Sequence, residues 1–251
     1  MSSAWPAQLW LVRHGESAGN VARNLAEKSG AASIEISGRD VDVPLSALGE
    51  RQSKAVGAWF ARLQPSERPS VVLTSPYSRA RQTSHLIVEA AKLGANAIQV
   101  ADERLREKEF GSLNRLTRAG IAARFPHEAE LRATLGKFYY RAPGGESWCD
   151  VILRLRSVLD HIQLRHAGER VLVVTHQVVI LCFRYLLENL DEQRLLEIDR
   201  AGDVANCAIT SFRACTSNGR ESLALTAYNF VAPLEDAGEP ITLGKDEARR
   251  E

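Results

Sequence analysis

The sequence has no excess of charge of either sign, and the lack of a net charge argues against binding partners that are recognised by charge alone. Its 32 Lys and Arg residues are balanced by 31 Asp and Glu residues, for a net charge of +1. Such a chain has no overall field that would draw it to nucleic acid or to an anionic membrane. Any attraction for an anionic ligand must therefore come from cations that the fold gathers locally.

Cysteines and long apolar stretches are also scarce. The four cysteines form no C-x-x-C pair and show no zinc-type spacing, so free thiols in a reducing compartment are favoured over disulfides. The longest apolar stretch, residues 171–183, is interrupted at residues 175–177 and is too short to span a bilayer. The first eight residues lack the pattern of a secretory signal. We therefore expect a cytoplasmic protein with neither a membrane nor a nucleic-acid partner.

What is present is the composition of an ordinary globular protein. Hydrophobic residues make up 45% and charged residues 25% of the 251 positions. That length fits one large α/β domain. We expect residues 1–231 to form a single domain, and residues 232–251, which are rich in Pro, Gly and charge, to be a loosely held tail.

Apolar runs that are followed by helical patterns predict a sheet and its connections. Strand candidates are the segments 9–12, 71–75, 97–101 and 170–175. Helical patterns cover residues 18–28, 46–63, 77–93, 117–125, 128–135, 148–165 and 177–190. The alternating segments 208–212 and 222–230 predict a hairpin at a sheet edge. We therefore predict an α/β fold, a three-layer sandwich with a mostly parallel, doubly wound sheet and helices on both faces.

Histidine and arginine side chains stand where three of these strands end. Arg13 and His14 follow the first strand, and Gly15 lets the chain turn sharply there. His176 follows the last parallel strand, and Arg79 lies early in the helix after the second. The carboxyl ends of parallel strands share one edge of a sheet, which is where ligands gather in such folds. Arg81 lies beside Arg79 in the first turns of that helix. An anion held between the two arginines and the free N–H groups of the helix would relieve their repulsion, so the pattern favours a phosphate site, with a solvent-exposed arginine pair as the alternative.

Three further segments are candidates for parts of that site. Residues 102–110 carry three glutamates, Glu103, Glu107 and Glu109, any one of which could carry a proton inside a cationic pocket. Residues 137–147 combine cations, aromatics and tight turns, a mixture that suits a ligand-wrapping loop. Residues 29–43 are expected to form a loop near the first motif, either a partial lid or a plain surface loop.

Six ordered blocks of sequence together resemble the signature of a known family. They are Leu11–Ser17 with Asn20, Pro44–Gln52, Thr74–Thr83, Leu105–Gly111, Pro143–Ser147 and Val174–His176. In this order they are similar to the histidine phosphatase (phosphoglycerate mutase-like) superfamily, and the likeness extends over residues 9–230. The resemblance implies a phosphoglycerate mutase-like fold and phosphoryl chemistry.

The resemblance also assigns roles to residues. His14 would be the nucleophile that becomes phosphohistidine, and Glu107 would protonate the leaving oxygen. Phosphoryl oxygens would be held by Arg13, Arg79 and His176, with Asn20 at the edge of the phosphate. Neither a metal nor another cofactor is implied. Physically, neighbouring arginines disfavour a protonated imidazole and stabilise the charge of an in-line transition state.

Within the superfamily, the chain looks most like the fructose-2,6-bisphosphatase branch. That likeness implies that five residues hold the sugar and its second phosphate: Arg132, Lys137, Arg141, Trp148 and Gln177. Trp148 stands where that branch has tyrosine, the spacing from Arg132 to Lys137 is one residue longer, and residues 29–43 form a longer segment. No Walker A motif of a kinase domain is present.

We therefore predict a metal-independent phosphatase that hydrolyses a small phosphorylated metabolite, a sugar phosphate or bisphosphate, through phosphohistidine on His14. A phosphoglycerate mutase is the alternative, although residues 112–141 are short for the insertion that keeps water from a mutase phosphoenzyme. A non-catalytic phospholigand-binding module is a third hypothesis, and it would be expected to have lost the nucleophile or the acid. The expected partner is a small phosphorylated substrate, and a homodimer is left open.

Overall fold

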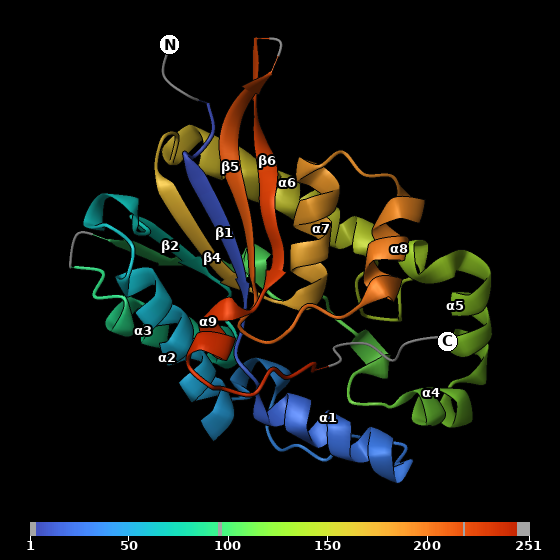
Figure 1. The fold of residues 1–251 in the computed structure, drawn as a ribbon. Coiled ribbons are helices and arrows are strands. Elements are labelled where there is room, and N and C mark those ends of the chain that lie inside the picture. The colour runs from blue at the N-terminus through green and yellow to red at the C-terminus, as the bar shows by residue number, and fades with distance from the viewer. Residues whose placement is uncertain (1–3, 95–96, 218, 245–251) are drawn as a thin grey trace.

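A computed structural model describes residues 4–94, 97–217 and 219–244, and its centre is one six-stranded sheet (Figure 1). The strands, in the spatial order β3-β2-β4-β1-β5-β6, are Ile98–Ala101, Val71–Thr74, Arg170–Thr175, Gln8–Arg13, Ile209–Ser217 and Arg220–Phe230. The first four run parallel, and β5 and β6 are antiparallel. This arrangement confirms both the mostly parallel sheet and the hairpin at its edge.

The helices follow the predicted pattern, with two additions. They are α1 Ala18–Ser29, α2 Ala47–Ala61, α3 Ser78–Ala90, α4 Arg118–Arg124, α5 Pro126–Tyr139, α6 Trp148–Arg165, α7 Gln177–Leu187, α8 Glu192–Ala201 and α9 Ala232–Asp236. The two that were not predicted are α8, whose sequence is mostly polar, and the five-residue α9. Helix α5 bends at Gly136, which has a φ of 76°.

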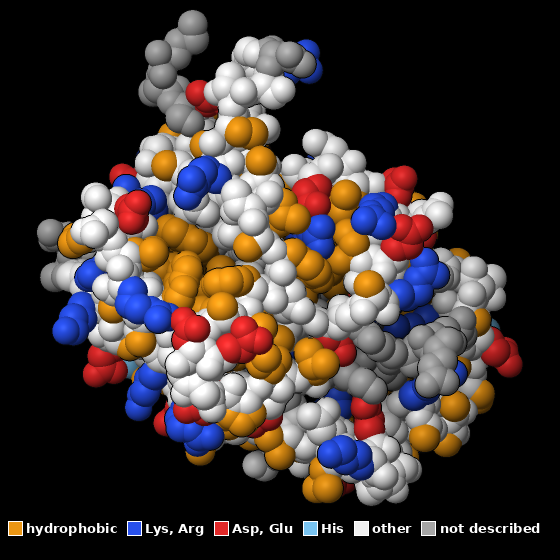
Figure 2. Space-filling view, viewed as in Figure 1, with side chains coloured by type: hydrophobic (Ala, Val, Ile, Leu, Met, Phe, Trp, Pro, Cys, Tyr) orange, Lys and Arg blue, Asp and Glu red, His pale blue; other side chains and the backbone are white. Residues whose placement is uncertain are grey.

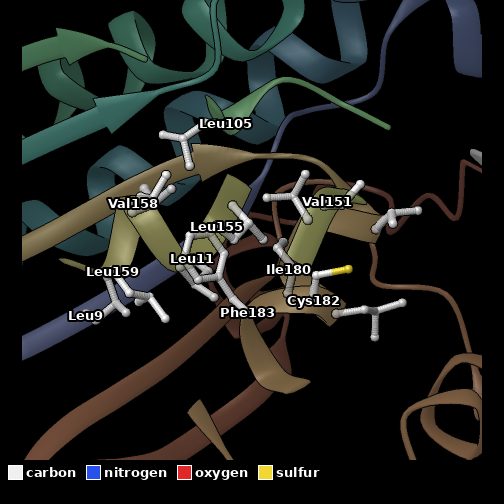
Figure 3. Packing of buried hydrophobic residues seen from close by; sticks show 14 of the residues in the cluster. Leu9, Leu11, Leu105, Val151, Leu155, Val158, Leu159, Ile180, Cys182 and Phe183 are labelled. Atoms are coloured by element: carbon white, nitrogen blue, oxygen red, sulfur yellow. The ribbon is translucent and has the colours of Figure 1, made fainter. Parts of the chain in front are cut away.

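Alternating side chains of the central strands divide the core into two layers. From β1, Leu9 and Leu11 join the cluster formed with α6 and α7, whereas Trp10 and Val12 join the cluster formed with α2 and α3. Figure 3 shows the first cluster, with residues of α6 and α7 packed around the two leucines. Both faces of β1, β2 and β4 are thus buried, which is why these three strands read as continuous apolar runs, whereas the edge strand β3 is exposed. The three-layer sandwich is confirmed.

The segment after residue 231 packs more closely than the sequence predicts. Helix α9 places Leu234 in the core with no exposed surface. Further on, Gln52 Nε2 donates to Thr242 Oγ1 at 3.0 Å, and Asn206 N donates to Thr242 O at 3.0 Å. The expectation of a loose tail is therefore wrong for residues 232–244, because hydrogen bonds and one buried leucine hold it. Residues 245–251 lie outside the described part.

Two surface properties agree with the composition. On the face seen in Figure 2, Lys and Arg side chains are interspersed with Asp and Glu, as the small net charge requires. Among the helices that the structure describes, none combines the length and the apolarity needed to cross a bilayer. The four cysteines are free; Cys182 and Cys207 are buried and Cys215 is exposed.

The strand register decides which side chains meet at the carboxyl edge of the sheet. Arg13 at the end of β1 is paired with Thr175 at the end of β4, and Thr74 of β2 is paired with Val174. The next residue of each strand is His14, His176 or Ser75. Pairing that runs to the last residue therefore brings the two histidines side by side.

Candidate active site

His14 lies at the centre of this edge and is almost fully buried, with 1% of its surface exposed. Its Nδ1 lies 2.7 Å from Gly15 O. A carbonyl oxygen can only accept, so Nδ1 carries the proton and Nε2 keeps its lone pair. The backbone behind it is held as well, because Gly15 N donates to Thr83 Oγ1 at 3.0 Å and Asn206 Nδ2 donates to His14 O at 3.1 Å. The imidazole is fixed in the tautomer that a nucleophile attacking through Nε2 needs.

The turn after His14 is pressed against the start of helix α2. Ser46 caps that helix by accepting from Gly49 N, and Ser46 Oγ donates to Glu16 Oε1 at 2.7 Å. A Cβ atom at Gly49 would stand 2.0 Å from Glu16 O, and one at Gly15 would stand 2.5 Å from Gly49 O. Only glycine leaves room for two backbone segments to approach this closely.

The electrostatic surroundings keep His14 neutral. Burial, and then the positive charges of Arg79 and Arg13, lower the pKa of His14 well below its ordinary value of 6.5. A neutral imidazole is the form that can attack phosphorus. The same two cations would attract the phosphoryl group that it attacks.

His176 forms the second half of the centre. Its ring lies 5.1 Å from that of His14, centroid to centroid, and its Nε2 is 2.8 Å from Ser75 Oγ. Its Nδ1 has no hydrogen-bond partner among the described residues and lies 3.9 Å from Glu107 Oε2. Burial, and then Arg79, lower the pKa of His176 well below 6.5. A buried polar atom without a partner is a position at which a ligand atom is expected.

Of the three candidate glutamates, the structure brings Glu107 to this centre. Its side chain is 3% exposed, and its Oε1 accepts from Lys108 N at 2.8 Å. Glu109 instead accepts a hydrogen bond from Tyr77 OH at 2.9 Å, while Glu103 is exposed and follows Asp102 in a short 3₁₀ helix. Position therefore distinguishes the three carboxylates that the sequence leaves equivalent.

Both arginines are already in contact with the protein. Arg13 NH1 donates to Val204 O at 2.5 Å, and Arg13 NH2 donates to Gly244 O. Arg79 NH1 donates to Asp40 O at 2.9 Å, and its NH2 lies 3.3 Å from the Asp40 carboxylate. These contacts fix the guanidinium groups before a ligand binds, and the Asp40 carboxylate competes with an incoming anion for Arg79.

Asn20 joins this group from the first turn of helix α1. Its Oδ1 accepts from Ser17 N at 3.1 Å, completing the capping box of the helix, and from Asn206 Nδ2 at 3.3 Å. A Cβ atom at Gly244 would stand 2.4 Å from Asn20 Nδ2. Residues 240–244 therefore close one side of the centre.

A pocket opens next to the buried histidines and leads to solvent. It has about 530 Å³ of space, part of it outside the surface. Its lining residues are Ser17, Gly19, Asn20, Arg23, Ile34, Ile36, Asp40, Val43, Arg79, Glu107, Phe110, Asn114 and Arg115. Three residues that the resemblance assigns to the site, Asn20, Arg79 and Glu107, are among them. The loop 29–43 supplies four of the others and is thus a wall of the pocket.

The five residues expected to hold a sugar and a second phosphate are not in this lining. Lys137 Nζ is 2.8 Å from Asp199 Oδ2 and also lies over the Trp148 ring. Trp148 is fully buried in the core, Arg141 pairs with Asp150, and Arg132 stacks on Tyr140. Gln177 Nε2 donates to Asp203 Oδ1 at 2.9 Å. The structure therefore does not gather this set around the described pocket, because several of its polar groups bind protein partners.

Four residues contact the centre without having been assigned to it from the sequence: Asp40, Ser75, Thr83 and Asn206. Ser75 and Thr83 lie inside a block that carried the resemblance, so their position was a usable signal. Asp40 begins a three-residue 3₁₀ helix within the segment 29–43, which was expected to be a loop, and Asn206 follows an unpredicted helix, so no local pattern pointed to either.

Comparisons with known proteins identify the family of the chain. Residues 9–226 match the family described as the histidine phosphatase superfamily (branch 1). A Schizosaccharomyces pombe protein named "Probable fructose-2,6-bisphosphatase" is 30% identical over 187 residues, which are 74% of this chain and 40% of that protein. The Yersinia enterocolitica protein named "Probable phosphoglycerate mutase GpmB" is 33% identical over 177 residues, 70% of this chain and 72% of that one.

Solved structures show the same fold. A mycobacterial glucosyl-3-phosphoglycerate phosphatase has a TM-score of 0.68 at 24% identity, over 90% of this chain and all of the other. An Escherichia coli protein named "putative alpha-ribazole-5'-P phosphatase" has a TM-score of 0.66 at 16% identity, over 98% of this chain and all of that one. At these identities the likeness concerns the arrangement of strands and helices.

Proposed function

The chain belongs to the histidine phosphatase superfamily, and from this membership we propose that it is a phosphatase that hydrolyses a small phosphomonoester through a phosphohistidine on His14. The observation that carries the proposal is the neutral, Nδ1-protonated imidazole of His14 among two arginines, a second histidine and the carboxyl group of Glu107. Relatives named as phosphatases and mutases support phosphoryl chemistry.

In the first step, His14 Nε2 attacks phosphorus and the bond from phosphorus to the ester oxygen breaks. Glu107, in its protonated form, gives its proton to that leaving oxygen, so that an alcohol departs. Arg13, Arg79 and His176 bind the phosphoryl oxygens, whose charge they stabilise in the transition state. His176 Nδ1, which has no hydrogen-bond partner among the described residues, offers one such contact.

In the second step, water attacks the phosphohistidine from the side that the alcohol has left. Glu107, now a carboxylate, takes a proton from this water, and the bond from phosphorus to Nε2 breaks. Inorganic phosphate leaves, and His14 returns to its neutral form with Glu107 protonated again. One carboxyl group thus serves as acid and then as base within a covalent mechanism.

Replacing His14 by Ala tests this proposal. We expect kcat/KM for p-nitrophenyl phosphate to fall by roughly 10⁴-fold or more, because the covalent route is lost. His85→Ala is the matched control, since His85 is exposed on α3 and lies outside the pocket lining. Enzyme quenched in alkaline detergent should carry a base-stable, acid-labile phosphoryl group only when His14 is present. Substantial turnover by His14→Ala, or labelling of that variant, would reject the proposal.

A phosphoglycerate mutase is the second candidate, because a relative that is 33% identical carries that name. A mutase and a phosphatase share the first step and differ in what accepts the phosphoryl group. Exchange between 2- and 3-phosphoglycerate in the presence of 2,3-bisphosphoglycerate, at a rate above phosphate release, would favour the mutase. We expect phosphate release to dominate, since the pocket is open to solvent and water can reach the phosphoenzyme.

A further inference from the structure

One cation of the pocket lining has no polar partner among the described residues. Of the three arginines there, Arg79 pairs with Asp40, and Arg115 donates to Ile36 O and Gly38 O. Arg23 makes neither a hydrogen bond nor an ion pair with any residue that the structure describes. A half-buried guanidinium with unused donors favours an anionic ligand.

Arg23 is placed to act together with the phosphate site. It lies three residues after Asn20 on helix α1, and residues with that spacing share a helix face. The step along the helix axis is about 4.5 Å, to which the length of the arginine side chain adds. Asn20 and Arg23 both line the pocket. The second cation therefore lies beyond the catalytic centre, within the reach of one small molecule.

A second segment of the pocket lining, residues 114–115, offers further donors. Asn114 is exposed and lines the pocket, and Arg115 beside it has a φ of 62°, a left-handed backbone that is uncommon outside glycine. This conformation is held because Ile34 N donates to Arg115 O at 2.8 Å and the Arg115 side chain donates to the loop backbone. Arg115 NH1 and NH2 each make one of these bonds, and a guanidinium has five N–H donors. Arg115 can therefore also donate into the pocket.

The lining also has an apolar part. It consists of Ile34, Ile36, Val43 and Phe110. Such a wall packs against carbon and leaves the polar groups of the lining to fix the orientation of the ligand. A molecule that uses the whole pocket has an anion at each end and a short carbon skeleton between them.

We propose that Arg23, with Asn114 and Arg115, forms a second anion subsite, so that the preferred substrates are small phosphomonoesters that carry a second anionic group, a carboxylate or a further phosphate. This inference rests on the proposed phosphatase function, and it assigns Arg23 a role in specificity and none in the chemical step. It places the second anion on α1 and the 114–115 segment, in place of Lys137 and Arg141, which are held in ion pairs.

Steady-state kinetics with three substrates test the subsite. p-Nitrophenyl phosphate has one anionic group, 3-phosphoglycerate adds a carboxylate, and 2,3-bisphosphoglycerate adds a second phosphate as well. For Arg23→Ala we expect KM to rise at least about tenfold with 3-phosphoglycerate and with 2,3-bisphosphoglycerate, and kcat/KM for p-nitrophenyl phosphate to stay within about twofold. Arg23→Lys should recover part of the loss. Comparing the losses with 3-phosphoglycerate and with 2,3-bisphosphoglycerate shows whether the subsite prefers a carboxylate or a phosphate.

Lys28→Ala is the matched control, because it removes one positive charge from an exposed position on the same helix, outside the pocket lining. It should change the kinetics of none of the three substrates. Equal losses with all substrates in Arg23→Ala, or no loss with any, would overturn the inference while leaving the phosphatase proposal intact. Melting temperatures of both variants guard against a folding defect.

A binding measurement separates failure of the subsite from failure of the proposed function. In the His14→Ala background, calorimetry with 2,3-bisphosphoglycerate and with inorganic phosphate needs no turnover. Adding Arg23→Ala should weaken binding of the bisphosphate about tenfold or more and leave that of inorganic phosphate nearly unchanged. Equal binding of the bisphosphate by the two variants would refute the subsite, even if the wild-type enzyme hydrolyses none of the substrates.

Discussion

The contact between Gly49 and the turn that carries His14 makes a quantitative prediction. In Gly49→Ala, the new Cβ would stand 2.0 Å from Glu16 O and 2.8 Å from Glu16 N. Both neighbours are backbone atoms, which cannot rotate away. The energetic cost of the clash should therefore lie at the upper end of the range for overpacked substitutions, about 3 kcal/mol. Alanine in a helix recovers about 1 kcal/mol relative to glycine. The strain exceeds this gain in helix propensity, and we expect a net loss of about 2 kcal/mol in the free energy of unfolding.

A loss of this size lowers the melting temperature by about 4–8 °C in a chain of this length. Thermal unfolding followed by circular dichroism measures it, with Gly202→Ala as control, because a Cβ at Gly202 meets nothing within 4 Å. We also expect kcat/KM to fall by up to about 100-fold, since a shift of the turn near 1 Å misplaces the nucleophile. If Gly49→Ala had the same melting temperature as the wild type and the control, the two segments would not be in contact as described.

Two further predictions concern charge in the centre. The pKa values of His14 and His176 are lowered in the folded state, so below about pH 6.5 the unfolded chain binds more protons. The free energy of unfolding should therefore decrease as the pH is lowered from 6.5 to 5.5, by up to about 1.4 kcal/mol per pH unit for each imidazole. Urea titrations at several pH values measure this decrease. It should be smaller in His14→Ala, and an unchanged decrease would contradict the assignment. Asp40→Asn removes a carboxylate 3.3 Å from Arg79 NH2, so inorganic phosphate should inhibit at roughly two- to fivefold lower concentration, given the partial exposure of the pair. An inhibition constant that is unchanged or higher would show that Asp40 does not compete with the anion.

Much of the fold followed from local patterns. The apolar runs, the alternating segments and the helix periodicity were enough to predict the parallel sheet, the edge hairpin and helix α6 over residues 148–165. These features depend on residues within a few positions of one another, so they can be read before the chain is folded. Helix α8 and the packed segment 232–244 were missed, because polar composition hides elements that tertiary contacts stabilise.

The candidate site, like the fold, was predicted only in part from the sequence. Residues that follow strand ends, such as His14 and His176, were predicted to meet, since parallel strands bring their carboxyl ends to one edge. Only the folded chain decided which acid faces them, that Lys137 pairs with Asp199, and that Arg23 has no such partner among the described residues. Those outcomes depend on which distant side chain arrives within about 3–4 Å, and short-range pattern does not encode that distance.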